Sequence, residues 1–186
     1  MRTIALFHPR TFHEKNYRYH YVPYSLLSVA SALDRSHYDV VLIDNNAAQS
    51  EDWKPWLASL REPPLCVGIT SMVGAQIKEG IAFGRAIHEV WPGVPVVWGG
   101  GLPTVLPELT ASHPAVDVAV QGQGQETFAE LVARLAGQRR GRRPERVAGG
   151  RRPGRLQSLQ SVRRLELLSA VPECLRPGRC RRLCPA

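Results

Sequence analysis

The chain has 186 residues and a formal net charge of +8 at pH 7, which leaves room for one domain with a substantial core and some additional chain, but not for two large domains. The charge is uneven, because residues 1–137 carry 10 Lys and Arg against 13 Asp and Glu, whereas residues 138–186 carry 14 Arg against 3 Glu. The four cysteines do not have the pattern of a disulfide framework in a secreted domain. No apolar stretch has the length of a signal peptide or of a membrane span of about 18 residues. We therefore expect a cytoplasmic protein without a membrane segment.

Up to Gly137, short apolar runs alternate with longer helical patterns. Strands are predicted at five continuous apolar runs, which are typical of a parallel sheet buried on both faces: 3–7, 38–43, 65–70, 94–98 and 116–120. Helices are predicted at 24–33, at 51–60, at 75–91, around 104–111 and at 126–137. The sequence therefore predicts five βα units in a doubly wound α/β fold, with a five-stranded parallel sheet in flavodoxin-like, Rossmann-like order and helices on both faces.

In such a sheet, ligands bind beyond the carboxyl ends of the strands, so functional residues are expected in the segments that follow the strands. A long loop rich in His and Tyr, 8–24, follows the first strand, and small or hydroxyl-bearing residues follow three others. The candidate binding residues are Ser71, Met72, Val73 and Gly74 after the third strand, Gly99, Gly100 and Gly101 after the fourth, and Gln121, Gly122 and Gly124 after the fifth. Each glycine alone is equally typical of a tight turn, but their occurrence at one edge indicates a large, flat ligand with polar edges.

Two common α/β functions do not fit these strand ends. The G-x-G-x-x-G motif of NAD-binding domains is not present, because the glycines at 122–124 follow the last strand and continue without the third glycine. A receiver domain is disfavoured because the first strand ends in Phe7-His8 without an acidic pair. We interpret Glu126 as a carboxylate at a helix start, and Asp44 and Asp117 as cap or turn residues, rather than as catalytic groups.

Four short motifs follow the third, fourth and fifth strands in order: Ser71-x-Val73, Gly99-Gly100, Leu102-Pro103-Thr104 leading into Leu106-Pro107-Glu108, and Gly122-x-Gly124 running into Glu126-Thr127-Phe128. As a set they resemble the N-terminal cobalamin-binding domain of B12-dependent radical SAM enzymes, above all the group that contains the anaerobic Mg-protoporphyrin monomethyl ester cyclase. The resemblance covers residues 2–137, with all five βα units in order.

This resemblance implies a corrinoid over the carboxyl edge of the sheet, with its nucleotide tail inserted between the ends of the first, third and fourth strands. Ser71 would be a hydrogen-bond partner beside the benzimidazole, together with Val73. Gly99 and Gly100 would lie where a Cβ would collide with the tail. A bulky residue at Gly100 is therefore expected to abolish cobalamin binding and to leave the sheet folded.

The ligand of the cobalt ion is less clearly indicated. Classical B12 domains carry a D-x-H-x-x-G motif after the first strand, whose His coordinates cobalt from below, and this sequence lacks that motif. Imidazole is a suitable cobalt ligand, so His8, His13 and His20 are the candidates in the first loop. The alternative is that the Tyr-rich part of the same loop covers the lower face.

Relatives in this family continue into a radical SAM barrel, whose C-x-x-x-C-x-x-C loop holds a [4Fe-4S] cluster and S-adenosylmethionine. Cys180 and Cys184 have the first spacing of this motif, but only two residues follow them. We therefore expect the cluster and S-adenosylmethionine only in an intact relative, and cobalamin binding without radical generation in this chain. Methyl transfer or radical rearrangement would then require a separate or lost barrel.

Residues 138–186 are rich in Arg and too poor in apolar residues to predict a fold, so a disordered basic tail is expected. Two interpretations stay open. The segment is a basic arm for nucleic acid or another polyanion, or it is the product of a reading-frame shift near residue 137, which the abrupt change of composition favours. The alternatives to a cobalamin domain are accordingly a flavodoxin-like nucleotide- or flavin-binding module and a nucleic-acid-binding protein that acts through this tail.

Overall fold

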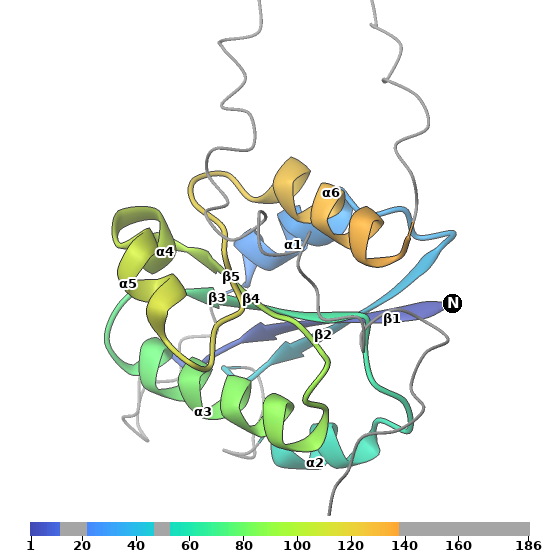
Figure 1. Cartoon of the computed structure of the whole chain (residues 1–186), viewed down its shortest axis with the longest axis horizontal. Helices are drawn as coiled ribbons and strands as arrows, with labels where there is room; N and C mark the ends of the chain where they lie inside the picture. The colour runs from blue at the N-terminus through green and yellow to red at the C-terminus, as the bar shows by residue number, and fades with distance from the viewer. Residues whose placement is uncertain (12–21, 47–52, 138–186) are drawn as a thin grey trace, which may run out of the picture.

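The computed structural model describes residues 1–11, 22–46 and 53–137. In this part of the chain, a five-stranded sheet lies between two layers of helices (Figure 1). The strands are β1 (Arg2–His8), β2 (Tyr38–Asp44), β3 (Cys66–Ser71), β4 (Val96–Gly100) and β5 (Val118–Ala119). They are all parallel and lie in the order β2-β1-β3-β4-β5. The predicted fold class and the flavodoxin-like strand order are confirmed.

The helices are α1 (Tyr24–Ser31), α2 (Lys54–Ser59), α3 (Ala75–Val90), α4 (Gly101–Val105), α5 (Pro107–Ser112) and α6 (Gln125–Leu135). Helices α1 and α6 cover one face of the sheet, and α2 and α3 cover the other (Figure 1). None of these helices is long and apolar enough to span a membrane.

The prediction of one helix around 104–111 is wrong, because this segment forms two short helices that meet at Leu106. Leu106 has φ −127° and ψ 61°, which is outside the helical region. Pro107 follows it, and the proline ring disfavours a helical conformation of the preceding residue. The predicted basic tail at 138–186 and the histidines His13 and His20 lie outside the described residues.

The sheet separates two hydrophobic cores, because successive side chains of each strand point to opposite faces. On the side of α1 and α6, Leu6 and Val97 pack with Phe128 of α6. On the side of α2 and α3, Phe7 stacks on Phe83 of α3 with ring centroids 4.0 Å apart, and Trp98 belongs to the same cluster. Val97 and Trp98, which are neighbours in β4, thus pack in different cores.

The amino ends of β4 and β5 are joined by a side chain. The Asp117 carboxylate accepts a hydrogen bond from the backbone N–H of Val96 at 2.7 Å and lies 2.8 Å from Nε2 of His88 at the end of α3. Asp117 thus holds the start of β5 against β4 and α3, and its interpretation as a cap or turn residue stays a prediction. Because β5 has only two residues, these contacts add to its short pairing with β4.

The reactivity of Cys66 is a probe for the burial of the core beneath α1 and α6. It is fully buried, and desolvation raises the pKa of its thiol to about 12. The thiolate is the reactive form, so at about pH 8 we expect Cys66 to resist iodoacetamide in the folded protein and to react after unfolding in urea. Because the folded-state pKa lies above the ordinary value of 9.0, ionisation of the unfolded thiol also favours unfolding as the pH rises above that value.

Mass spectrometry of the peptide that contains Cys66 measures this reactivity separately from that of the other cysteines. Equal rates of modification before and after unfolding would contradict the burial of Cys66.

Candidate ligand site at the carboxyl edge of the sheet

An open cavity of about 190 Å³ lies between the sheet and the helices α1 and α6, at the carboxyl ends of the strands. Its apolar lining comes from the sheet and from the two helices: Leu6, Leu26, Val29, Ile69, Val97, Val120 and Phe128. Its polar lining consists of Ser25, Ser28, Thr70, Gln123 and Gln125, and five glycines complete it: Gly68, Gly99, Gly100, Gly122 and Gly124. None of these described lining residues is charged. Such a cavity suits an uncharged, mostly apolar group that makes a few hydrogen bonds.

The structure gives a different answer at three of these positions to the question of whether a glycine is required there. At Gly68, a Cβ would lie 2.8 Å from Leu6 Cδ2, so this glycine is needed for the packing of the core. At Gly100, φ is +98° and a Cβ would lie 2.6 Å from the carbonyl oxygen of Ser71, so the close approach of β3 to β4 excludes a side chain. At Gly99, φ is outside the left-handed region and no heavy atom lies within 4 Å of a Cβ. The fold itself therefore tolerates a side chain at Gly99, and that side chain would occupy the cavity.

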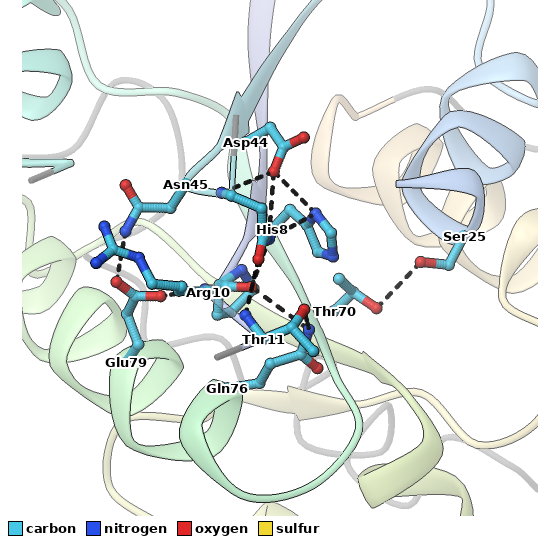
Figure 2. Close-up of polar contacts among 11 residues, drawn as sticks. His8, Arg10, Thr11, Ser25, Asp44, Asn45, Thr70, Gln76 and Glu79 are labelled. Carbon is cyan, nitrogen blue, oxygen red and sulfur yellow. Dashed lines mark hydrogen bonds and ion pairs between the residues drawn. The ribbon is translucent and has the colours of Figure 1, made fainter. Parts of the chain in front are cut away.

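Thr70 and Ser71 have different surroundings because successive residues of a strand alternate in direction. Thr70 lines the cavity, and its Oγ1 lies 3.2 Å from Oγ of Ser25 on α1 (Figure 2). Ser71 is fully buried, does not line the cavity, and its Oγ has no hydrogen-bond partner among the described residues. The structure thus brings Thr70 to the cavity, whereas the sequence had indicated Ser71.

The other predicted binding residues divide into two groups. Those that line the cavity are Gly99, Gly100, Gly122 and Gly124. Those that lie outside its lining are Met72, Val73, Gly74, Gly101 and Gln121. Met72 and Val73 are 63% and 72% exposed in the loop after β3, so they present an apolar surface to solvent at the edge of the sheet. Their predicted contact with a ligand stays a prediction.

Thr104 of α4, which was not predicted as a site residue, connects the two glycine loops beside the cavity. Its hydroxyl donates to the carbonyl of Gly100 at 2.6 Å and accepts from the backbone N–H of Gly122 at 3.1 Å. Its own carbonyl accepts a hydrogen bond from the Gln121 side chain at 3.2 Å. The sequence offered two signals: Thr104 belongs to the Leu102-Pro103-Thr104 motif, and it lies four residues after Gly100 in a helical pattern, where a hydroxyl can bond back to a carbonyl.

At the same edge of the sheet, beside β2 and α3, side-chain hydrogen bonds hold the start of the loop after β1 (Figure 2). Asn46 accepts from the backbone N–H of Thr11 at 2.8 Å and donates to the carbonyl of Pro9 at 3.0 Å. Gln76 of α3 donates to the Thr11 hydroxyl at 3.1 Å and accepts from the backbone N–H of Met72 at 2.9 Å. The loops after β1 and β3 are therefore fixed to each other through one glutamine.

Glu79 extends this network along α3. Its carboxylate accepts hydrogen bonds from the backbone N–H of Arg10 and from the side chain of Asn45, which is almost fully buried (Figure 2). These contacts join residues that are 34 and 69 positions apart in the sequence. Their effect is to place the first residues after β1 in a defined position at the end of the sheet.

His8, the described member of the three cobalt candidates, ends β1. It is 7% exposed, and its Nδ1 lies 2.9 Å from the carboxylate of Asp44 (Figure 2). The side-chain amide of Asn46 lies 3.1 Å from the same Nδ1, so this nitrogen faces both a carboxylate, which accepts, and an amide N–H, which donates. A carboxylate also orients the imidazole of many metal-binding histidines, and the role of His8 toward cobalt stays a prediction.

Comparison with known proteins identifies the family of the chain. Residues 15–132 match the family model described as B12 binding domain. An uncharacterized methyltransferase of Pyrococcus horikoshii is 31% identical over 111 residues, which are 59% of this chain and 24% of that protein. The chain thus spans about a quarter of this relative.

Two solved structures share the fold. One is the radical S-adenosylmethionine methyltransferase TsrM from Kitasatospora setae, with a TM-score of 0.62 and 23% identity over 75% of this chain and 26% of that chain. The other is OxsB, a cobalamin-dependent S-adenosylmethionine radical enzyme with aqua-cobalamin and S-adenosylmethionine bound, with a TM-score of 0.60 and 18% identity over 75% of this chain and 19% of that chain.

The geometry at the end of β4 predicts opposite effects of two neighbouring substitutions on the free energy of unfolding. Gly99→Val is expected to leave it unchanged or slightly raised, because the side chain enters open space in a strand. Gly100→Val is expected to lower it by at least about 2 kcal/mol, because a side chain there requires a left-handed φ and meets the Ser71 carbonyl. Urea unfolding followed by circular dichroism measures both.

This geometry overturns the expectation that a bulky residue at Gly100 leaves the sheet intact, and it makes Gly99 the diagnostic position. Equal stability of the two variants would contradict the close approach of β3 to Gly100.

Proposed function

Because the chain belongs to the B12 binding domain family, we propose that its carboxyl-edge cavity holds the nucleotide tail of cobalamin. The observation that carries this proposal is the open space at Gly99. Neither the backbone conformation nor the packing of the protein requires a glycine there, so the position is explained by a bound group that needs the space. The lining fits the benzimidazole of the tail, which is an uncharged aromatic ring system with a nitrogen acceptor.

The residues of the cavity have distinct parts in this proposal. Thr70 is the hydrogen-bond donor to the ring nitrogen, in place of the predicted Ser71, because its hydroxyl lines the cavity. Leu26 and Phe128 form apolar walls for the ring system. Thr104 holds the glycine loops that border the tail, and the exposed Met72 extends the apolar surface toward the corrin.

When bound, cobalamin supplies a cobalt centre that can carry a methyl group or assist radical chemistry. The part of this chain is to bind and orient the cofactor with residues 1–137. We infer that catalysis requires a radical SAM barrel with its [4Fe-4S] cluster and S-adenosylmethionine, on a separate or adjoining polypeptide. The likeness to TsrM and OxsB, whose chains this protein covers only to 26% and 19%, supports this inference.

Reconstitution with hydroxocobalamin tests the proposal. The desalted wild-type protein is expected to retain a corrinoid absorption spectrum, and Gly99→Val is expected to bind roughly tenfold more weakly or worse while remaining folded. Gly101→Ala is the matched control, because its Cβ would make only ordinary contacts, 3.7 Å from the nearest atom, outside the cavity. Thr70→Val removes one hydrogen bond worth about 1 kcal/mol, so a roughly fivefold loss of affinity is expected.

A parallel titration with FMN separates the alternative function. Retention of FMN without cobalamin would replace the proposal by the flavin-binding module. Retention of cobalamin by Gly99→Val at wild-type affinity would refute the placement of the tail in this cavity.

A further inference from the structure

The lining of the carboxyl-edge cavity changes from polar to apolar with depth. The most buried lining side chains are apolar, and each is at most 5% exposed: Leu6, Leu26, Val97, Val120 and Phe128. The polar lining side chains lie nearer to solvent, since two are exposed, two are half-buried and one is 7% exposed: Ser25, Gln123, Ser28, Gln125 and Thr70. A group that enters the cavity therefore passes its hydrogen-bond partners at the mouth.

The register of the sheet shows the same order along the strands. Leu6, Gly68 and Val97 are aligned across β1, β3 and β4. The pair of Thr70 and Gly99 lies two residues further toward the carboxyl edge, on the same face of the sheet. The inner level thus carries two apolar side chains and a glycine, and the outer level carries the hydroxyl of Thr70.

Leu6 and Phe128 close the inner end of the cavity above Gly68. A Cβ at Gly68 would lie 2.8 Å from Leu6 Cδ2 and 3.3 Å from Phe128 Cζ, so both side chains reach over this glycine. The backbone of Gly68 pairs with neighbouring strands on both sides. None of the described residues that form this inner end carries a polar side chain.

At the mouth, four polar side chains are already bonded to one another. Ser25 Oγ lies 3.2 Å from Thr70 Oγ1, and the side chain of Gln125 donates to Oγ of Ser28 at 2.9 Å. Two hydroxyls have two O–H donors, and one of these is used within the pair of Ser25 and Thr70. The pair therefore keeps one O–H for an acceptor of a ligand.

On the basis of the proposed function, we propose that this cavity selects a corrinoid by the base of its nucleotide tail, and prefers dimethylbenzimidazole to adenine. The two bases have nearly the same size and shape, so volume does not separate them. Each offers one imidazole nitrogen to the hydroxyl pair. The six-membered ring of dimethylbenzimidazole contains only carbon, whereas that of adenine has two ring nitrogens and an amino group.

The inner end of the cavity distinguishes these two rings by polarity. With the imidazole nitrogen at the hydroxyl pair, the six-membered ring lies toward Leu6 and Phe128. The methyl groups of dimethylbenzimidazole gain from burial there. The amino group and ring nitrogens of adenine would lose their bonds to water without finding a partner, which is strongly unfavourable.

Equilibrium dialysis of the full chain measures this preference. The two ligands are hydroxocobalamin and its analogue that carries adenine in place of dimethylbenzimidazole. Cobalamin is expected to bind roughly tenfold more tightly. Adenine binds cobalt more weakly and leaves it more readily, so a difference in release from cobalt would act in the opposite direction.

Two isosteric substitutions assign the preference to the inner end. Val97→Thr places a hydroxyl at that end, where it can bond to adenine, and should reduce the preference by roughly threefold or more. Val96→Thr is the matched control, because Val96 is also buried but packs in the core beside α3, and it should leave the ratio of affinities unchanged. Circular dichroism checks that both variants are folded.

The binding results distinguish a failure of this preference from a failure of the proposed function. Absence of binding of both corrinoids would refute the proposed function and the preference with it. Binding of both with equal affinity, or tighter binding of the adenine form, would overturn the preference alone. An unchanged ratio in folded Val97→Thr, or the same reduction in Val96→Thr, would also overturn it. The wild-type comparison needs no variant, so it decides even where Val97→Thr does not fold.

Discussion

The pairing of β3 with β4 at their carboxyl ends is the contact on which the rest of the site depends. Ser71 lies opposite Gly100 in the register, and the carbonyl of Ser71 approaches Gly100 so closely that no side chain fits there. This approach fixes where α4 begins, because Gly100 is its N-cap residue. From that start, Thr104 reaches back to bind the loops after β4 and β5. The preceding pair, Thr70 opposite Gly99, then borders the cavity with a hydroxyl on one strand and open space on the other.

Much of this arrangement could be predicted from the sequence. Continuous apolar runs identify strands that are buried on both faces, and helical patterns between them imply parallel pairing, so the fold and the relevant edge follow from local signals. Helix boundaries were less well predicted, as the break at Leu106 shows. The proline after it was visible in the sequence, but the short length of the two resulting helices depends on how they pack.

Individual site residues were harder to assign, because they depend on the phase of a strand. A difference of one position changes the face of the sheet, and this is what separates Thr70 from Ser71. The sequence also does not show why a glycine stands at each position. Gly68, Gly99 and Gly100 look alike in a sequence, and they differ only in the atoms that surround the position of the missing Cβ. The contacts that Gln76 and Glu79 make with Thr11 and Arg10 join residues 65 and 69 positions apart, and no local pattern contains such pairs.

The alternation along β4 has a consequence for how this domain can change. Trp98 packs in the core beside α3 on one face, and Gly99, the next residue, lines the carboxyl-edge cavity on the other. Substitutions at alternate positions can therefore reshape the cavity without adding atoms to the core beside α3, so the two faces can vary separately. An insertion of one residue in β4 has the opposite effect. It would exchange the two faces, fill the space at Gly99 with a large side chain and leave a hole beside α3, so that a single change of length disrupts the cavity and the core together.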